Sequence, residues 1–157
     1  MTERFAPAAV LVLSLALLAF WLSGRGWDPS LTVESHAADP VAFAARYDAQ
    51  AAAHGTGETI GTAPVVRPPP GDVAIRVRRW EFSPALELQP GKTYRLHLLA
   101  EDVVHSAAIG EAEVLLEPGV VKVVTLTTPK SGRVRIQCAE YCGLGHTKMI
   151  GSIEVLP

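Results

Sequence analysis

The residues with the clearest capacity for chemistry lie together near the end of the chain. Two thiols, one imidazole and one thioether occur within a single short segment, at Cys138, Cys142, His146 and Met149. Soft sulfur ligands combined with imidazole are typical of copper, zinc or iron–sulfur sites. Gly143 and Gly145 allow the backbone between these residues to fold tightly, so that the four side chains can converge on one point.

The second cysteine distinguishes this segment from a mononuclear blue-copper site, which needs one Cys, two His and a weak Met ligand. Two neighbouring thiolates can bridge a pair of copper ions, and each copper then needs one imidazole and one weak ligand. A second histidine must therefore come from elsewhere in the chain. His105 is the best candidate, because it follows a predicted strand that ends near Ala100. We expect the other three histidines to be surface residues: His36, His54 and His97.

Three other interpretations of the cysteine segment remain open. A disulfide between the two cysteines explains neither His146 nor Met149. A zinc site of two Cys and two His leaves Met149 unused. A copper chaperone or copper store would bind a single Cu(I) and would show no two-copper spectrum.

The scaffold for this segment is predicted to be a β-domain. Five stretches with alternating or β-branched residues are separated by Pro-Gly and Ser-Gly turns: 72–79, 94–98, 120–127, 133–137 and 150–155. This pattern over residues 71–157 predicts a small antiparallel sandwich or barrel. The cysteine segment then lies in a loop between its last two strands.

The first 24 residues are predicted to be a transmembrane anchor. Residues 5–24 carry no charge and, as a helix, would span about 30 Å. Trp21 and Trp27 flank the end of this block, as interfacial aromatic residues do. A cleaved signal peptide is the alternative, but its apolar region should be shorter and its start more basic. One arginine flanks each end of this block, Arg4 and Arg25, so the charge distribution does not predict the orientation of the helix in the membrane.

Residues 25–70 are predicted to be a tether. Asp39 and Pro40 predict the start of a helix, and Gly55 predicts its end. Its large apolar residues are Val41, Phe43 and Tyr47, which would rest on a partner protein or the membrane surface unless the helix is a solvated spacer. Pro64 and residues 68–71 are expected to interrupt regular structure before the β-domain.

The charge of the whole chain excludes some classes of function. Lys and Arg total 14 and Asp and Glu total 16 in 157 residues, so no overall positive field is available to bind nucleic acid. Five acids surround His105 in a stretch without Lys or Arg: Glu101, Asp102, Glu111, Glu113 and Glu117. Trp80 shares strand parity with Arg76 and Arg78, which predicts an indole outside the core.

The pattern Cys-x-Glu-x-Cys-x3-His-x2-Met, with Asp-Val-x-His-Ser upstream, resembles the CuA domain of cytochrome c oxidase subunit II over residues 72–157. The resemblance implies an all-β, cupredoxin-like antiparallel sandwich behind one N-terminal transmembrane helix. It implies a binuclear copper centre, with the backbone carbonyl of Glu140 completing the ligand set: His105, Cys138, Glu140, Cys142, His146 and Met149. It also implies that the Glu140 side chain can help to hold Mg²⁺ at the boundary with the catalytic subunit.

By the same resemblance, the chain accepts single electrons from cytochrome c and passes them to haem in subunit I, where oxygen is reduced to water and protons are translocated. Trp80 would be the point at which electrons enter, and the acids around His105 would steer a basic cytochrome. The expected location is the bacterial inner membrane, with a single span and a periplasmic copper domain. Two alternatives are the CuA subunit of a nitric oxide reductase and a membrane-anchored periplasmic copper-binding protein. A single predicted span and a short, acidic stretch after His105 depart from many family members.

Overall fold

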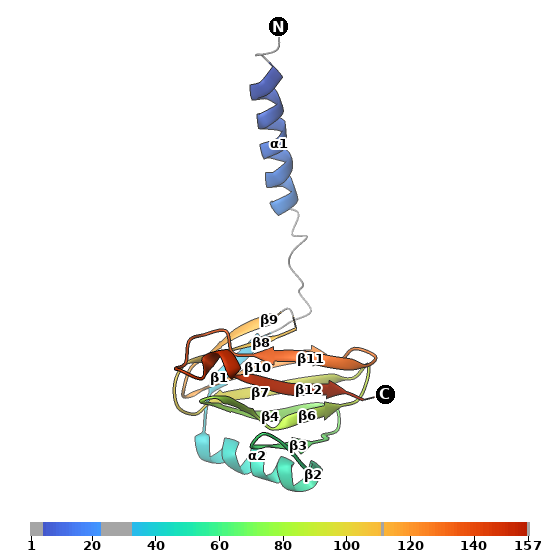
Figure 1. Ribbon diagram of the computed structural model, residues 1–157, viewed down its shortest axis with the longest axis vertical. Coiled ribbons are helices and arrows are strands. Elements are labelled where there is room, and N and C mark those ends of the chain that lie inside the picture. Colours follow the sequence, from blue (N-terminus) through green and yellow to red (C-terminus); the bar gives the residue numbers. More distant parts are fainter. Residues whose placement is uncertain (1–4, 23–32, 111, 157) are drawn as a thin grey trace. The chain divides into compact units, whose positions relative to one another are not determined.

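A computed structural model describes residues 5–22, 33–110 and 112–156 (Figure 1). The chain divides into two compact units, residues 1–30 and 31–157. The first contains helix α1 (Phe5–Leu22), whose large apolar side chains from Val10 to Leu22 are exposed. Among the helices of the described residues, none combines the length and hydropathy needed to cross a membrane. The predicted span is therefore not confirmed, and Arg4, Arg25, Trp27 and Glu111 lie outside the described residues.

The second unit is a β-sandwich with one helix, and its described residues form two sheets. One sheet has five strands in the spatial order β1 (Val33–Ala37), β10 (Val120–Thr127), β7 (Thr93–Ala100), β4 (Gly71–Arg78) and β5 (Glu81–Ser83). The other has seven, in the order β2 (Gly55–Ile60), β3 (Ala63–Val66), β6 (Ala85–Leu88), β12 (Ile150–Val155), β11 (Gly132–Gln137), β8 (His105–Ile109) and β9 (Ala112–Leu116).

The core between the sheets is built from alternate residues of each strand. On β4 the side chains of Val73, Ile75 and Val77 are buried, as the alternation in the sequence predicts. Cys138, Cys142 and Met149 belong to the same buried cluster. Three of the six predicted metal ligands are thus part of the main hydrophobic core, where packing restricts their movement.

The sheets are mixed, which corrects the prediction of an antiparallel sandwich. Strand β4 runs parallel to β7, and β6 runs parallel to both β12 and β3. The other ladders are antiparallel. Alternation of apolar residues shows which face of a strand is buried, but it does not show the direction of the neighbouring strand.

Residues 33–70 are part of this folded unit, which differs from the predicted tether. Strand β1 pairs with β10 over five residues, while β2 and β3 extend the larger sheet. Pro64 lies within β3 instead of interrupting regular structure. Strands β1 and β2 are short and largely polar, so the local sequence pattern did not predict that they would form part of a sheet.

Helix α2 (Pro40–His54) begins and ends where the sequence predicts. The Asp39 carboxylate accepts hydrogen bonds from the backbone N–H groups of Val41 and Ala42, each at 3.0 Å. Phe43 and Tyr47 are buried against the five-stranded sheet of the same chain, and this corrects the prediction that they rest on a partner or the membrane. Figure 1 shows α2 packed along one side of the sandwich.

Hydrogen bonds also connect α2 to the five-stranded sheet. The Tyr47 hydroxyl is 2.7 Å from the Ser83 hydroxyl. The Gln50 side chain donates to the carbonyl oxygen of Ala74 at 3.1 Å and accepts from its N–H at 2.8 Å. These two bonds satisfy backbone groups of β4 that a solvated spacer would leave to water.

Candidate metal centre

The loop that carries the sulfur residues connects β11 to β12 and is closed at its base by a backbone hydrogen bond. The N–H of Cys138 donates to the carbonyl oxygen of Met149 at 3.0 Å. Between these residues the chain includes a short 3-10 helix, His146–Lys148. His105 is the first residue of β8. The Ser106 hydroxyl accepts from the N–H of Ala139 at 2.9 Å, so that the loop is joined directly to β8.

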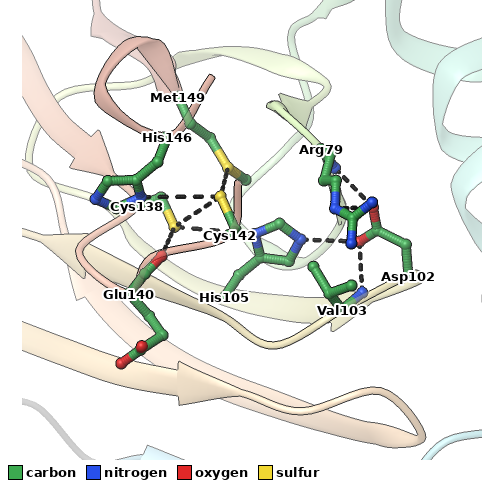
Figure 2. A network of polar contacts seen from close by, with 9 residues as sticks. All are labelled: Arg79, Asp102, Val103, His105, Cys138, Glu140, Cys142, His146 and Met149. Atoms are coloured by element: carbon green, nitrogen blue, oxygen red, sulfur yellow. Dashed lines mark hydrogen bonds and ion pairs between the residues drawn. The ribbon is translucent and has the colours of Figure 1, made fainter. Parts of the chain in front are cut away.

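All six predicted ligands lie together at this end of the sandwich (Figure 2). The two sulfur atoms of Cys138 and Cys142 are 3.9 Å apart. The His105 Nδ1 atom is 3.8 Å from the Cys138 sulfur, and the Glu140 carbonyl oxygen is 3.1 Å from it.

The Cys142 sulfur has a matching set of neighbours. It lies 3.8 Å from the His146 Nδ1 atom and 3.6 Å from the Met149 sulfur. Each thiol therefore has one imidazole and one weak donor beside it. The donor atoms of His105, Cys138 and Cys142 all lie within 4.8 Å of one another.

Asp102 holds His105 in the orientation that a metal ligand needs. Its carboxylate lies 2.8 Å from the His105 Nε2 atom. A carboxylate can only accept, so Nε2 carries a proton, and in the neutral imidazole Nδ1 then has the lone pair on the side of Cys138. Such carboxylate–histidine pairs are common behind bound metals. The N–H groups of Arg79 and Val103 also donate to Asp102, and together with the His105 hydrogen bond they hold its pKa below the usual range against the effect of burial.

The site excludes water from most of its donors. His105 and Met149 are fully buried, while Cys138 and Cys142 are 1% and 5% exposed. Burial, with the adjacent Cys138, raises the pKa of the Cys142 thiol to about 11. In the absence of a cation the thiol is therefore protonated, and metal binding would release that proton.

The donor set fits copper on several grounds. The cysteines are free, and 3.9 Å between their sulfurs is far beyond the ~2.05 Å of a disulfide bond. A metal ion placed between them can lie at a metal–thiolate distance of ~2.3 Å from both. Two thiols, two imidazoles, a thioether and a carbonyl form a soft donor set that suits copper.

Trp80 lies against the ligand loop. It is in the turn between β4 and β5 and is 45% exposed, so the prediction of an indole outside the core is correct. Its ring packs on two glycines: a Cβ atom at Gly143 would lie 3.5 Å from the indole Nε1, and one at Gly145 would lie 2.7 Å from Cγ. The absence of a side chain at Gly145 therefore makes room for the indole.

Three of the four described acids around His105 have a partner, and only Glu113 has none among the described residues. Glu101 binds Arg76 through two hydrogen bonds of 2.5 and 3.0 Å. Asp102 is occupied by His105 as described above, and Glu117 lies 3.9 Å from Lys122. Among the described residues, no ion pair involves Glu113, which is exposed.

His97 is not the surface residue that the sequence predicted. It is 7% exposed, and its Nε2 atom is 2.7 Å from the Asp72 carboxylate. Burial lowers the pKa of His97, in spite of the opposing hydrogen bond to Asp72. His36 is exposed as expected and His54 is half-buried, and neither lies at the sulfur cluster.

Sequence reasoning missed the residues that support the ligands. Asp102 was grouped with possible steering acids, although its position three residues before His105 is a signal for an orienting contact. The bond from Ala139 to Ser106 and the packing of Trp80 on Gly145 had no local signal, because they join segments far apart in the chain.

Comparisons with known proteins agree with this site. The family model for the periplasmic domain of cytochrome c oxidase subunit II matches residues 76–156, which is more than half of the chain. Cytochrome c oxidase subunit 2 of Thermus thermophilus is 31% identical over 96 residues, which cover 58% of this chain and 71% of that relative. A second subunit 2 sequence from the same species has the same identity, and the match covers 57% of it. A probable cytochrome c oxidase subunit 2 of Streptomyces coelicolor is 34% identical over 77 residues, or 46% of this chain and 24% of that protein.

Solved structures support the fold. A subunit in a haem–copper terminal oxidase dimer superposes with a TM-score of 0.56 at 19% identity, covering 99% of this chain and all of that one. The periplasmic domain of cytochrome oxidase subunit II from Bradyrhizobium japonicum gives 0.50 at 18% identity, covering 54% and 83%. The sandwich is thus cupredoxin-like, and with the sequence matches it shows that the chain belongs to the cytochrome c oxidase subunit II family, the electron-transfer subunits of haem–copper terminal oxidases.

Proposed function

We propose that this chain holds a binuclear CuA centre through His105, Cys138, the Glu140 carbonyl, Cys142, His146 and Met149. The observation that carries the proposal is the symmetry of the buried cluster. Each thiol has one imidazole nitrogen at 3.8 Å and one weak donor within 3.6 Å. A zinc site of two Cys and two His would leave the buried Met149 without a role.

A binuclear copper centre held by these residues would supply reversible one-electron chemistry. The protein's contribution is to keep the donors in place in both redox states. The bond between Cys138 and Met149 closes the loop, and Asp102 holds the His105 ring. Burial of the sulfurs keeps solvent away, which limits the reorganisation that accompanies each electron.

In the proposed electron path, cytochrome c delivers single electrons at Trp80 and the chain passes them to haem in subunit I. Oxygen is reduced to water there, and protons are translocated. The path is supported by the indole, which is both half-exposed and packed against the loop that carries Cys142 and His146. Glu140, whose side chain is exposed beside the cluster, is available to help hold Mg²⁺ at the subunit I boundary.

The proposed location is the bacterial inner membrane, with α1 as a single-pass anchor and the β-domain in the periplasm. The matched family domain is periplasmic. Support for the anchor comes from the composition of α1, which is uncharged over its 18 residues, and from its exposed apolar side chains. At 1.5 Å per residue such a helix is about 27 Å long.

Copper content combined with electron paramagnetic resonance tests this proposal on the full chain. A fragment that begins at residue 71 is unsuitable, because it lacks β1, α2, β2 and β3. We expect two coppers per chain and one unpaired electron shared between two copper nuclei. One copper per chain, or zinc in its place, would contradict the proposal and favour a copper carrier or a structural site.

A further inference from the structure

An open groove of about 760 Å³ lies next to the metal loop. Its walls come from the β2–β3 turn, the β4–β5 turn and strands β11 and β12. Trp80 and Ile150 both line it. Because Ile150 directly follows Met149 and Trp80 packs on Gly145, the groove extends to the edge of the candidate metal centre.

The charged residues of the groove are mostly arginines. Four arginines and two glutamates line it, which gives the lining a net charge of +2: Arg78, Arg79, Arg133, Arg135, Glu81 and Glu154. Arg79 also lies 4.0 Å from Asp102, which does not line the groove. This excess is local, since the chain as a whole has a net charge of −2.

In the ion pairs in and beside the groove, the arginine side chain is more exposed than the carboxylate side chain. In the pair of Arg133 and Glu154 the side chains are 73% and 30% exposed. In the pair of Arg78 and Glu81 they are 55% and 16% exposed. The carboxylates therefore lie beneath the guanidinium groups, and the surface that a partner meets is positive. Each guanidinium has five N–H donors, so several remain available.

Three exposed apolar side chains of this region, here called the apolar cluster, are Tyr141, Leu144 and Ile150, of which Ile150 lines the groove together with the arginines. Leu144 is 95% exposed, Tyr141 69% and Ile150 58%, and all three belong to the metal loop or follow it directly. An apolar area beside a charged rim is the usual composition of a docking surface for a transient partner.

We propose that this arginine-lined groove and the adjoining apolar cluster form the docking site for an acidic electron donor, a c-type cytochrome whose exposed haem edge is surrounded by carboxylates. The inference rests on the proposed function and adds the sign of the partner's charge, which is opposite to the one that the acids around His105 suggested. Among the described acids, Glu101 is paired with Arg76 and Asp102 lies 4.0 Å from Arg79, whereas Glu113 is exposed and forms no ion pair with a described residue.

Stopped-flow reduction of the copper-loaded full chain tests the charge. The probes are two reduced c-type cytochromes with known surface charge, one acidic and one basic. We expect the acidic cytochrome to react faster at low ionic strength and its rate constant to fall as salt is added, because opposite charges accelerate association and salt screens them. The double variant Arg133→Gln/Arg135→Gln should lower that rate constant by about tenfold at low salt and flatten its salt dependence.

Arg67→Gln is the matched control. Arg67 is an exposed arginine paired with a more buried glutamate, Glu87, and it does not line the groove. Its rate constants should equal those of the wild type. Copper content is measured for every variant, so that rates refer to loaded centres.

The outcomes separate this inference from the function on which it rests. A faster reaction with the basic cytochrome, or equal rates for the double variant and Arg67→Gln, would overturn the acidic-donor inference and leave the electron-carrier function intact. A chain that lacks the two-copper spectrum, or that neither cytochrome reduces, would overturn both.

Discussion

At the scale of single residues, the two thiols and their neighbours have unequal roles in the candidate centre. Cys138 and Cys142 face each other, and each contacts one imidazole and one weak donor. Met149 contacts only the Cys142 sulfur among these donors. Loss of a bridging thiol should therefore remove the paired site, whereas loss of the thioether should alter one metal alone.

We expect Cys142→Ser to lose the shared-electron spectrum and Met149→Leu to retain two coppers at a shifted reduction potential. Leucine fills a volume similar to that of methionine in the buried position but offers no donor. Resonance spectra and potentiometry check both variants. A normal binuclear spectrum in Cys142→Ser would contradict the ligand assignment.

Asp102 is a positioning residue for His105. We expect Asp102→Ala to weaken copper binding by about 10–100-fold, because the imidazole loses the hydrogen bond that holds its tautomer and orientation. Asp102→Asn should weaken it less, since its amide oxygen can still accept from Nε2. Competition with a copper chelator measures the dissociation constants, and equal constants for the wild type and Asp102→Ala would exclude this role.

At the scale of elements, the ligand loop and helix α2 both depend on contacts with distant parts of the chain. The loop fits under Trp80 only because position 145 has no side chain. Helix α2 is attached through Phe43 and Tyr47, which share a buried cluster with Ala74, Leu99, Val121 and Val123.

Gly145→Ala should destabilise the chain by about 1–3 kcal/mol, because the new Cβ would lie within 2.8 Å of several indole atoms and the ring or loop must move. Urea unfolding measures the change. In the double variant Gly145→Ala/Trp80→Ala the added methyl group should cost almost nothing relative to Trp80→Ala. Equal penalties in both backgrounds would show that the indole does not restrict this position.

Phe43→Ala should lower the free energy of unfolding by about 3 kcal/mol, because it removes a buried aromatic ring between α2 and the sheet. Val41→Ala is the control on the same helix, where a side chain that is 80% exposed should matter by less than about 0.5 kcal/mol. If both substitutions had the same small effect in urea unfolding, α2 would be a solvated spacer after all.

At the scale of the whole molecule, the stability of the sandwich should depend on pH through His97. Its pKa is lowered by burial, opposed by the hydrogen bond to Asp72, and the nearby guanidinium of Arg46 also lowers it. The folded chain therefore binds fewer protons than the unfolded chain, whose histidine has a pKa of ~6.5. The contribution of neutral His97 to the free energy of unfolding is fully present above the unfolded pKa of ~6.5. It is lost as the pH falls through the lower pKa of the folded state.

We expect the melting temperature to fall between pH 7.5 and pH 5.5, and His97→Gln to show a flatter dependence than the wild type. His54→Gln is the control, because His54 is half-buried at the end of α2. His36 is unsuitable, since its ring centroid lies 6.3 Å from that of His97. Circular dichroism measures the melting curves at each pH. Parallel curves for the wild type and His97→Gln would show that this histidine does not contribute.

Local patterns in the amino-acid sequence were enough to predict the chemistry of the site and much of its framework. The types and spacing of Cys138, Cys142, His146 and Met149 specify a soft-metal loop, and the caps of α2 and the bounds of β10 and β12 follow from turn residues and alternation. These features depend on neighbours in the chain, which is why local patterns reveal them.

Contacts between segments that are far apart in the chain could not be predicted from these patterns. The parallel pairing of β4 with β7, the place of residues 33–70 in the sandwich and the burial of His97 all depend on which strand or helix lies alongside. The same is true of Asp102 behind His105, of Trp80 over Gly145, and of the arginines that gather from β4, β11 and their turns into one groove. Packing brings these residues together, and no local periodicity encodes the identity of a neighbour that is many residues away.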